Sequence, residues 1–273
     1  MVEPPAAGTV VAPSADDAGA AGPAHPLRRF LGDRLAAAGL AIVLLLGLAA
    51  VLAPVLAPHD PTTIDATRSL EPPSGEHPLG TDELGRDVLS RLLFGARWSL
   101  GIASLATLAV MVLGTAVGLV AGYFGGWVDA VIMRVVDSLL ALPNLVLYLA
   151  IIGTLGPGLR NVFIALVSIS WAAYARVMRG MVLSVRERAF VRASRSLGAG
   201  DGRLMARHVL PNVVSPMVVL GSLQLGGTIL ALAALGFFGL GAQPPTLEWG
   251  TMINQGRLFL QTNPGLMIYP GIA

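Results

Sequence analysis

Long uncharged stretches constrain this chain more than any other feature. Residues 35–58, 98–128 and 209–247 contain no acidic or basic side chain, and only 12% of the whole chain is charged. Soluble domains carry about 25% charged residues, and a membrane-spanning helix needs about 20 mostly apolar ones. The stretches are continuously apolar, whereas barrel strands alternate. We therefore expect an all-α integral membrane protein.

The apolar pattern predicts a polytopic bundle of about six transmembrane helices. The third span contains Pro143, and the 209–247 stretch is divided between the fifth span and an outer segment rich in glycine and proline. The last span has only about ten residues, half of what crossing requires, so we expect the rest of that helix to be missing from the sequence. The six spans are placed at residues 35–58, 98–128, 129–152, 161–181, 213–235 and from 264 onward.

Three domains are expected along the chain. Residues 1–26 are rich in alanine, proline and glycine and should form a disordered tail. Residues 27–97 form an N-terminal module with the first span and a polar outer segment, and residues 98–273 form the transmembrane core.

The basic residues, all of them arginine, predict the orientation. With the N-terminus in the cytoplasm, twelve arginines fall on the inner side and six on the outer side, as the positive-inside rule requires. The expected location is the plasma or inner membrane, crossed several times.

Residues 185–211 carry six of the 18 basic residues between two apolar stretches. Helix formers at 185–197, glycines at 198–202 and a second helix at 203–209 predict a helix–turn–helix, with Pro211 either ending it or starting the fifth span. Such a loop is large enough to be a docking surface for another protein. The alternative is a solvated basic turn that only enforces topology.

Several classes of chemistry are excluded or disfavoured. The chain has no cysteine, which excludes disulfides and zinc thiolates, and no Walker A motif, so it should not hydrolyse ATP itself. The net charge of +2 gives no reason to expect nucleic-acid binding. The four histidines are far apart in sequence, and we expect neither a catalytic residue, a metal site nor a cofactor in this chain. They are His25, His59, His77 and His208.

Local spacing predicts three structural features. Arg134 and Asp137 share a helix face and should form a structural ion pair or lie at a helix interface. Thr81 should be the N-cap of an outer amphipathic helix, with Asp82, Glu83 and Asp87 at its start, although these carboxylates also make a cation or receptor site imaginable. Small residues four apart should form a helix-packing face, at Gly114, Gly118 and Gly122.

The loop also resembles the EAA motif of permease subunits in ABC importers. The matching residues are Ala193, Ser194, Gly198 and the His-Val-Leu-Pro stretch at 208–211, with Arg192 in the glutamate position. The variant is similar to the dipeptide/oligopeptide/nickel branch. Residues 28–31, 77–91 and 236–250 resemble further parts of its C-type permease, so the likeness runs from about residue 27 to the end.

This resemblance implies a cytoplasmic coupling helix that docks on an ATPase. The implied partners are a second, B-type permease, one or two ABC ATPase subunits that bind ATP and Mg, an extracytoplasmic substrate-binding protein and membrane lipid. Peptides are the expected cargo, with nickel, haem or another small solute as alternatives. A secondary transporter is disfavoured because the spans lack central charges and a repeat. The implied coupling residues are Arg192, Ala193, Ser194, Arg195, Leu197, Gly198, Asp201, Arg203, His208, Leu210 and Pro211.

Overall fold

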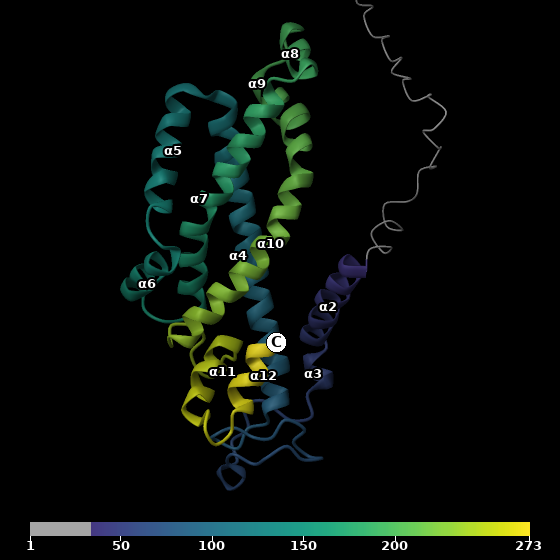
Figure 1. The fold of residues 1–273 in the computed structure, drawn as a ribbon, viewed down its shortest axis with the longest axis vertical. Helices are drawn as coiled ribbons and strands as arrows, with labels where there is room; N and C mark the ends of the chain where they lie inside the picture. The colour runs from purple at the N-terminus through teal and green to yellow at the C-terminus, as the bar shows by residue number, and fades with distance from the viewer. Residues whose placement is uncertain (1–33) are drawn as a thin grey trace, which may run out of the picture. The chain divides into compact units, whose positions relative to one another are not determined.

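The computed structural model describes residues 34–273, which form helices and connecting segments (Figure 1). Contacts divide the chain into two units, Met1–Leu45 and Leu46–Ala273, so that helix α2 (Arg34–Val51) begins in the first and ends in the second. The tail expected at 1–26 lies outside the described residues. The domain boundaries expected after residues 26 and 97 stay a prediction.

Three long helices build the second unit: α4 (Val88–Phe124), α7 (Leu159–Arg186) and α10 (Leu210–Phe237). Within the described part of the chain, three helical runs are long and apolar enough to cross a membrane, namely α4, α7 and the run that ends with α10. The expectation of an all-α membrane bundle is confirmed.

α4 and α7 pack closely because α4 presents glycines to its neighbour. A Cβ atom added at Gly118 would lie 2.5 Å from the carbonyl oxygen of Ala175, and one at Gly122 would lie 2.8 Å from that of Arg179. At Gly114 the added atom would lie 2.8 Å from the Cβ of Tyr174. The packing face predicted from the spacing of these glycines is confirmed.

The third predicted span is not one helix. α5 (Gly126–Leu140) and α6 (Asn144–Leu155) are separated by a short break and bent by 88°. Pro143 is the N-cap of α6 and cannot continue α5, because it has no backbone N–H and disfavours a helical residue before it. The third predicted span, over 129–152, is therefore a bent pair of helices.

Ion pairs join α5 to α7. Arg179 on α7 donates from Nε to the Oδ1 of Asp129 at 2.9 Å and from a second nitrogen to Oδ2. Asp137 is paired with Arg176 of α7. Of the two roles predicted for Arg134 and Asp137, an ion pair between them is wrong, whereas Asp137 does lie at a helix interface, where it pairs with Arg176.

The helix predicted to begin after Thr81 starts at Val88 instead and continues without a break into the second predicted span as α4. Asp87 is the N-cap of α4 and accepts a bond from the Ser90 amide at 2.7 Å. Thr81, the predicted N-cap, forms an isolated bridge with Asp87. Between them the Asp82 carboxylate accepts bonds from backbone amides and Gly85 takes a φ of +74°, so a tight turn forms there.

Shorter helices flank the bundle. α3 (Ala53–Leu56) follows α2, and the 3-10 turn η2 (Ala66–Arg68) lies in the 59–97 segment. Near the C-terminus, α11 (Trp249–Gly256), the 3-10 turn η4 (Arg257–Phe259) and α12 (Gly265–Ile272) follow α10. α11 was not predicted from the sequence pattern. Its N-cap is the buried Glu248, whose pKa is raised by burial despite hydrogen bonds from the Gly250 and Thr251 amides.

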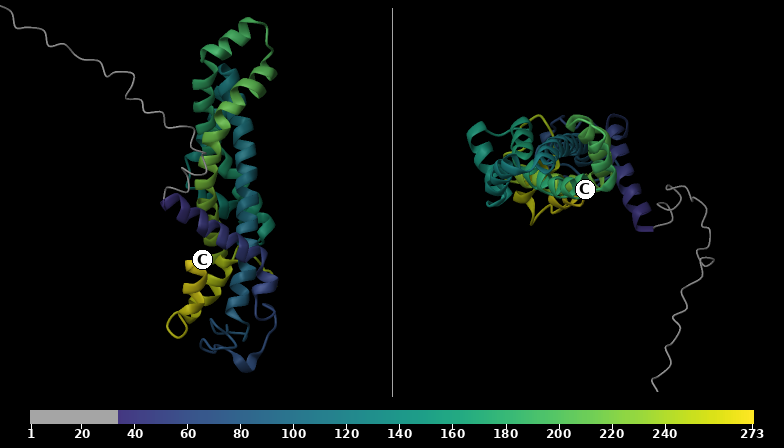
Figure 2. Two further views of the ribbon diagram at one scale, coloured as in Figure 1. Left: turned by 90° about the vertical axis from the view of Figure 1, so that its right-hand side faces the viewer. Right: turned by 90° about the horizontal axis from the view of Figure 1, so that it is seen from above.

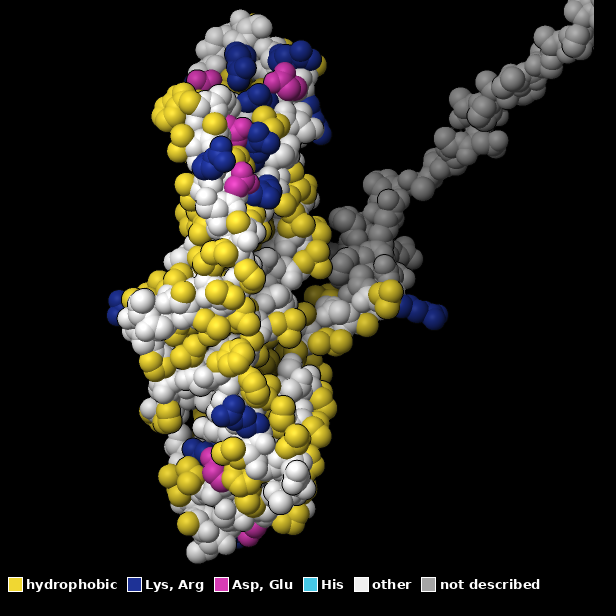
Figure 3. All heavy atoms as spheres, turned by 60° about the vertical axis from the view of Figure 1, so that its left-hand side comes forward, with side chains coloured by type: hydrophobic (Ala, Val, Ile, Leu, Met, Phe, Trp, Pro, Cys, Tyr) yellow, Lys and Arg dark blue, Asp and Glu magenta, His cyan; other side chains and the backbone are white. Residues whose placement is uncertain are grey.

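Within the second unit, two ends of the bundle are distinct. α8 (Ala189–Ser196) and α9 (Asp201–Leu204) lie at one end of α7, and α11 and α12 lie at the other (Figures 1 and 2). On the face shown in Figure 3, charged side chains gather at the α8–α9 end, above a region that is mostly apolar. The loop between α7 and α10 is thus presented at a charged end of an apolar bundle.

Candidate functional site

The 185–211 loop contains two short helices joined by a glycine-rich break. Gly198 follows α8 with a φ of +84°, a conformation that glycine adopts without the penalty of a side chain. Its amide donates to the Arg195 carbonyl at 2.9 Å, so the residue closes α8 in the manner of a C-terminal glycine cap. The predicted helix, glycine turn and helix are present, with α8 starting at Ala189.

The second half of the loop continues directly into the next long helix. α9, the π-helical turn η3 (Met205–Val209) and α10 run on from Asp201 to Phe237. Pro211 lies in the first turn of α10, directly after η3. Of the two predicted roles for Pro211, the structure has it starting the fifth span.

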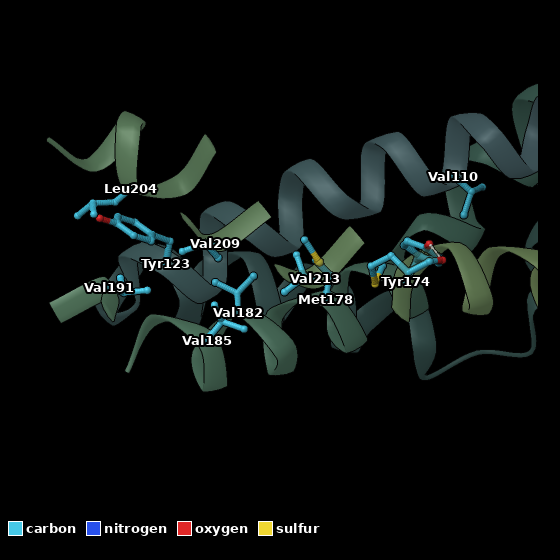
Figure 4. Packing of buried hydrophobic residues seen from close by; sticks show 11 residues of the cluster. Val110, Tyr123, Tyr174, Met178, Val182, Val185, Val191, Leu204, Val209 and Val213 are labelled. Atoms are coloured by element: carbon cyan, nitrogen blue, oxygen red, sulfur yellow. Dashed lines mark hydrogen bonds between the residues drawn. The ribbon is translucent and has the colours of Figure 1, made fainter. Parts of the chain in front are cut away.

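Apolar side chains hold the loop to the bundle. Val191 of α8, Leu204 of α9 and Val209 are fully buried. They join one apolar cluster with Tyr123 at the end of α4 and Val185 at the end of α7 (Figure 4). The loop is therefore a packed extension of the helix ends, and its position is set by α4 and α7.

Tyr123 also makes a polar link between α4 and both short helices. Its hydroxyl donates to the Asp201 Oδ1 at 2.6 Å and accepts from an Arg195 nitrogen at 3.1 Å. The Arg195 guanidinium lies 5.5 Å from the ring centroid, and the hydrogen bond to Tyr123 raises the pKa of Arg195. Tyr123 is not among the residues predicted from the sequence. A buried tyrosine at the end of an apolar run, which needs a partner for its hydroxyl, was the available signal.

Arg186 fixes the end of α7 against the end of α4. One guanidinium nitrogen donates to the carbonyl oxygens of Gly122 and Tyr123, at 2.8 and 3.1 Å. These carbonyls lie in the last turn of α4, which has no further helical partner for them and carries a partial negative charge. Arg186 thus caps α4.

The opposite side of the loop faces outward. Leu197 is 88% exposed, directly before Gly198, and Phe190 is 41% exposed. Arg192 and Arg203 are exposed and make no ion pair within residues 34–273. An exposed apolar side chain flanked by arginines is suited to binding an apolar pocket with an acidic rim.

The predicted coupling residues fall into groups with different environments. Arg195 and Asp201 face Tyr123, and the Ser194 hydroxyl donates to the Phe190 carbonyl oxygen at 2.9 Å. His208 lies beside Phe190, with ring centroids 6.3 Å apart. Exposed members are Arg192, Ala193, Arg195, Leu197, Gly198, Asp201, Arg203 and Pro211, and partly buried ones are Ser194, His208 and Leu210.

The histidines are not all isolated, as their sequence spacing suggested. His59 and His77 lie with ring centroids 4.6 Å apart in the 59–97 segment, and Glu76 lies beside them. The separation in sequence was misleading because the segment folds back on the N-terminal end of α4.

A bundle of apolar helices with an exposed, anchored loop is the architecture of a multi-helix membrane subunit. The chain belongs to the family of binding-protein-dependent transport system inner membrane components, whose model matches residues 114–273. A second match, to the N-terminal transmembrane domain of oligopeptide transport permease C, covers residues 26–73. The resemblance noted in the sequence is confirmed.

Relatives with different cargo names are about equally similar. A dipeptide transport system permease protein of Alkalihalophilus pseudofirmus is 40% identical, over 88% of this chain and 79% of the relative. A glutathione transport system permease protein of Pectobacterium atrosepticum is 42% identical, over 90% and 82%. A nickel transport system permease protein of Escherichia coli is 43% identical, over 86% and 84%.

Proposed function

We propose that this chain is one of two permease subunits of an ATP-driven importer and that its 185–211 loop couples the membrane bundle to a cytoplasmic ABC ATPase. A B-type permease completes the translocation path, and a substrate-binding protein delivers cargo from outside. The ATPase subunits bind ATP and Mg, and this chain supplies the moving membrane part.

The observation that carries the proposal is the two-sided construction of the loop. Its inner side is held by buried Val191 and Leu204, while Leu197 is left 88% exposed at the tip. Burying a leucine side chain is favourable by about 1.5–3 kcal/mol relative to leaving it in water. We therefore expect Leu197 to be buried in an apolar pocket of a partner. A solvated turn needs neither this exposed leucine nor the anchors beneath it.

The loop is placed in the cytoplasm on the basis of charge. Positive residues favour the cytoplasmic side of membrane proteins, and the loop carries six arginines. The same argument places the N-terminus inside, beside Arg28, Arg29 and Arg34.

Peptides are the proposed cargo. Relatives at 39–40% identity are named as dipeptide transport permeases, from Alkalihalophilus pseudofirmus and Haemophilus influenzae. Nickel or glutathione is the alternative supported by the names of other relatives. The test is uptake into proteoliposomes that contain the complex, with a panel of di- to pentapeptides, glutathione and Ni²⁺, each with and without ATP and binding protein. Uptake without ATP would contradict the importer and favour a secondary transporter.

Docking is tested with Leu197→Ala, using Leu258→Ala as the matched control. Leu258 is also highly exposed, at 77%, and lies in η4 away from the loop. Losing a buried leucine contact of about 1.5–3 kcal/mol should weaken ATPase retention more than tenfold, as measured by co-purification from detergent. The control should retain the ATPase. Equal retention by both variants would contradict the docking role of the loop.

A further inference from the structure

A second cluster of chemically capable side chains lies in the 59–97 segment, outside the loop. His59, Glu76 and His77 each offer one ligand atom, and these atoms lie within 4.8 Å of one another. They line an open pocket of about 330 Å³ together with Arg68 and Asp87. Histidine nitrogens and a carboxylate are a ligand set typical of zinc and neighbouring transition metals.

The spacing of the ligand atoms is close to that of a metal site. Bonds of zinc to nitrogen and oxygen are about 2.0–2.2 Å, so two ligand atoms of one tetrahedral ion lie about 3.4 Å apart. A pair at the 4.8 Å limit therefore needs to close by about 1.4 Å. Glu76 is exposed, so its carboxylate has room to move toward the histidines.

His77 is held in the orientation that a metal ligand requires. Its Nδ1 lies 2.9 Å from the Asp87 Oδ1 and donates its proton there, which leaves the Nε2 lone pair free for another partner. Asp87 is itself fixed, because its other oxygen accepts from the amide and hydroxyl of Ser90 at 2.7 Å. A carboxylate that orients a histidine is the usual second layer of zinc sites.

His59 is held at the start of α4, and its Nδ1 lies 3.9 Å from the Asp87 Oδ1, beyond hydrogen-bond distance. Its backbone amide donates to the Ser90 hydroxyl at 3.1 Å, which ties it to the start of α4. Its Nδ1 is buried and has no hydrogen-bond partner within residues 34–273. A buried ring nitrogen without a partner is costly, and ligation relieves that cost either directly or by letting the ring turn.

Arg68 occupies the place where a cation would sit. Its guanidinium lies 3.0 Å from the His77 Nε2 and 2.7 Å from a Glu76 oxygen, the two groups that a metal would bind. The side chain is about one-third exposed, and Asp65 offers it a second carboxylate at 3.9 Å. Arg68 can therefore turn toward Asp65 when a divalent ion takes its place.

We propose that His59, Glu76 and His77 bind one divalent transition metal of the zinc type, which Arg68 replaces in the metal-free protein. The ion joins the beginning of the 59–97 segment to its middle and, through Asp87, to the start of α4. It acts as a structural clamp on this segment, and the open side of the pocket leaves its remaining coordination position to water.

The test is zinc titration of the full chain, purified without a histidine tag and stripped of metal, against a chelator of known affinity. The wild type should bind one Zn²⁺, and His59→Ala and Glu76→Gln should each weaken binding about tenfold or more. Both positions are at least partly exposed, so these variants should fold, and Glu83→Gln is the matched control in the same segment. No zinc binding by the wild type, or equal binding by all four proteins, would overturn the proposal.

Arg68→Ala should change the zinc affinity in the direction opposite to His59→Ala and Glu76→Gln. Removing a competing positive charge should tighten zinc binding severalfold, whereas a purely structural role for Arg68 predicts weaker binding or none. Binding that is unchanged or weakened in Arg68→Ala would contradict the proposed exchange between arginine and metal.

Discussion

The 59–97 segment and the 185–211 loop are both rich in arginine but use it in opposite ways. In the segment, Arg68 pairs with Glu76, Arg86 with Asp82, and Arg91 with the same Asp82. In the loop, the only ion pair among the described residues is between the neighbours Arg186 and Glu187, at 3.3 Å.

The two regions differ in whether their arginines are paired within the chain. Charges that are paired within the chain hold a segment in one shape, whereas unpaired arginines on an anchored surface are available to a partner. The segment is folded on itself, and the loop leaves Arg192 and Arg203 exposed, as the proposed docking role requires.

The largest expected effect is a loss of stability in the 59–97 segment. Asp82→Ala leaves Arg91, whose side chain is only 4% exposed, without its acid. Removing one partner of a buried pair costs about 3–5 kcal/mol, so the protein should unfold at a markedly lower temperature in detergent. The control Glu83→Ala removes a more exposed acid and should cost less than about 1 kcal/mol. Equal melting temperatures for the two variants would contradict the view that buried ion pairs hold the 59–97 segment in shape.

A smaller effect is expected where the loop meets α4. Tyr123→Phe keeps the ring in the apolar cluster and removes the hydroxyl that joins Arg195 to Asp201. The loss should be about 1 kcal/mol of stability, with transport per ATP hydrolysed falling severalfold while the ATPase still co-purifies. The control Tyr148→Phe removes a hydroxyl bonded to Ser170 elsewhere in the bundle. If transport per ATP is unchanged in Tyr123→Phe, or is reduced equally in the control, then the Tyr123 hydroxyl does not couple the loop to α4.

The smallest effect on stability is expected for an exposed arginine of the 185–211 loop. Arg192→Ala in the loop should change the free energy of unfolding by no more than about 0.5 kcal/mol, because the side chain is exposed and unpaired within the described chain. ATPase affinity should nevertheless fall, measured by titration of the purified ATPase onto the permease in nanodiscs. A large loss of thermal stability, with ATPase affinity intact, would mean that the loop arginines serve the fold.

The features that the sequence predicted are those encoded by local pattern. Uncharged stretches gave the helices, four-residue spacing gave the glycine face of α4, and a glycine run gave the break between α8 and α9. Each depends on residues close together along one helix or turn.

What the sequence did not reveal depends on contacts between distant segments. Asp137 pairs with Arg176 on another helix, not with Arg134 three residues away. Tyr123 meets Arg195 and Asp201 more than 70 positions later. His59 and His77 meet because the chain turns back on the start of α4. No periodic pattern in the sequence predicts such a turn.

The glycine face between α4 and α7 has a mechanical consequence. Cβ atoms at Gly114, Gly118 or Gly122 would overlap the facing helix, so the two backbones are in direct contact over three successive turns. Any larger residue at these three positions would have to push the helices apart, so this half of α4 and the facing part of α7 are fixed at one separation. The ends of α4 and α7 that carry Tyr123 and Arg186 therefore hold the loop at one place relative to both helices.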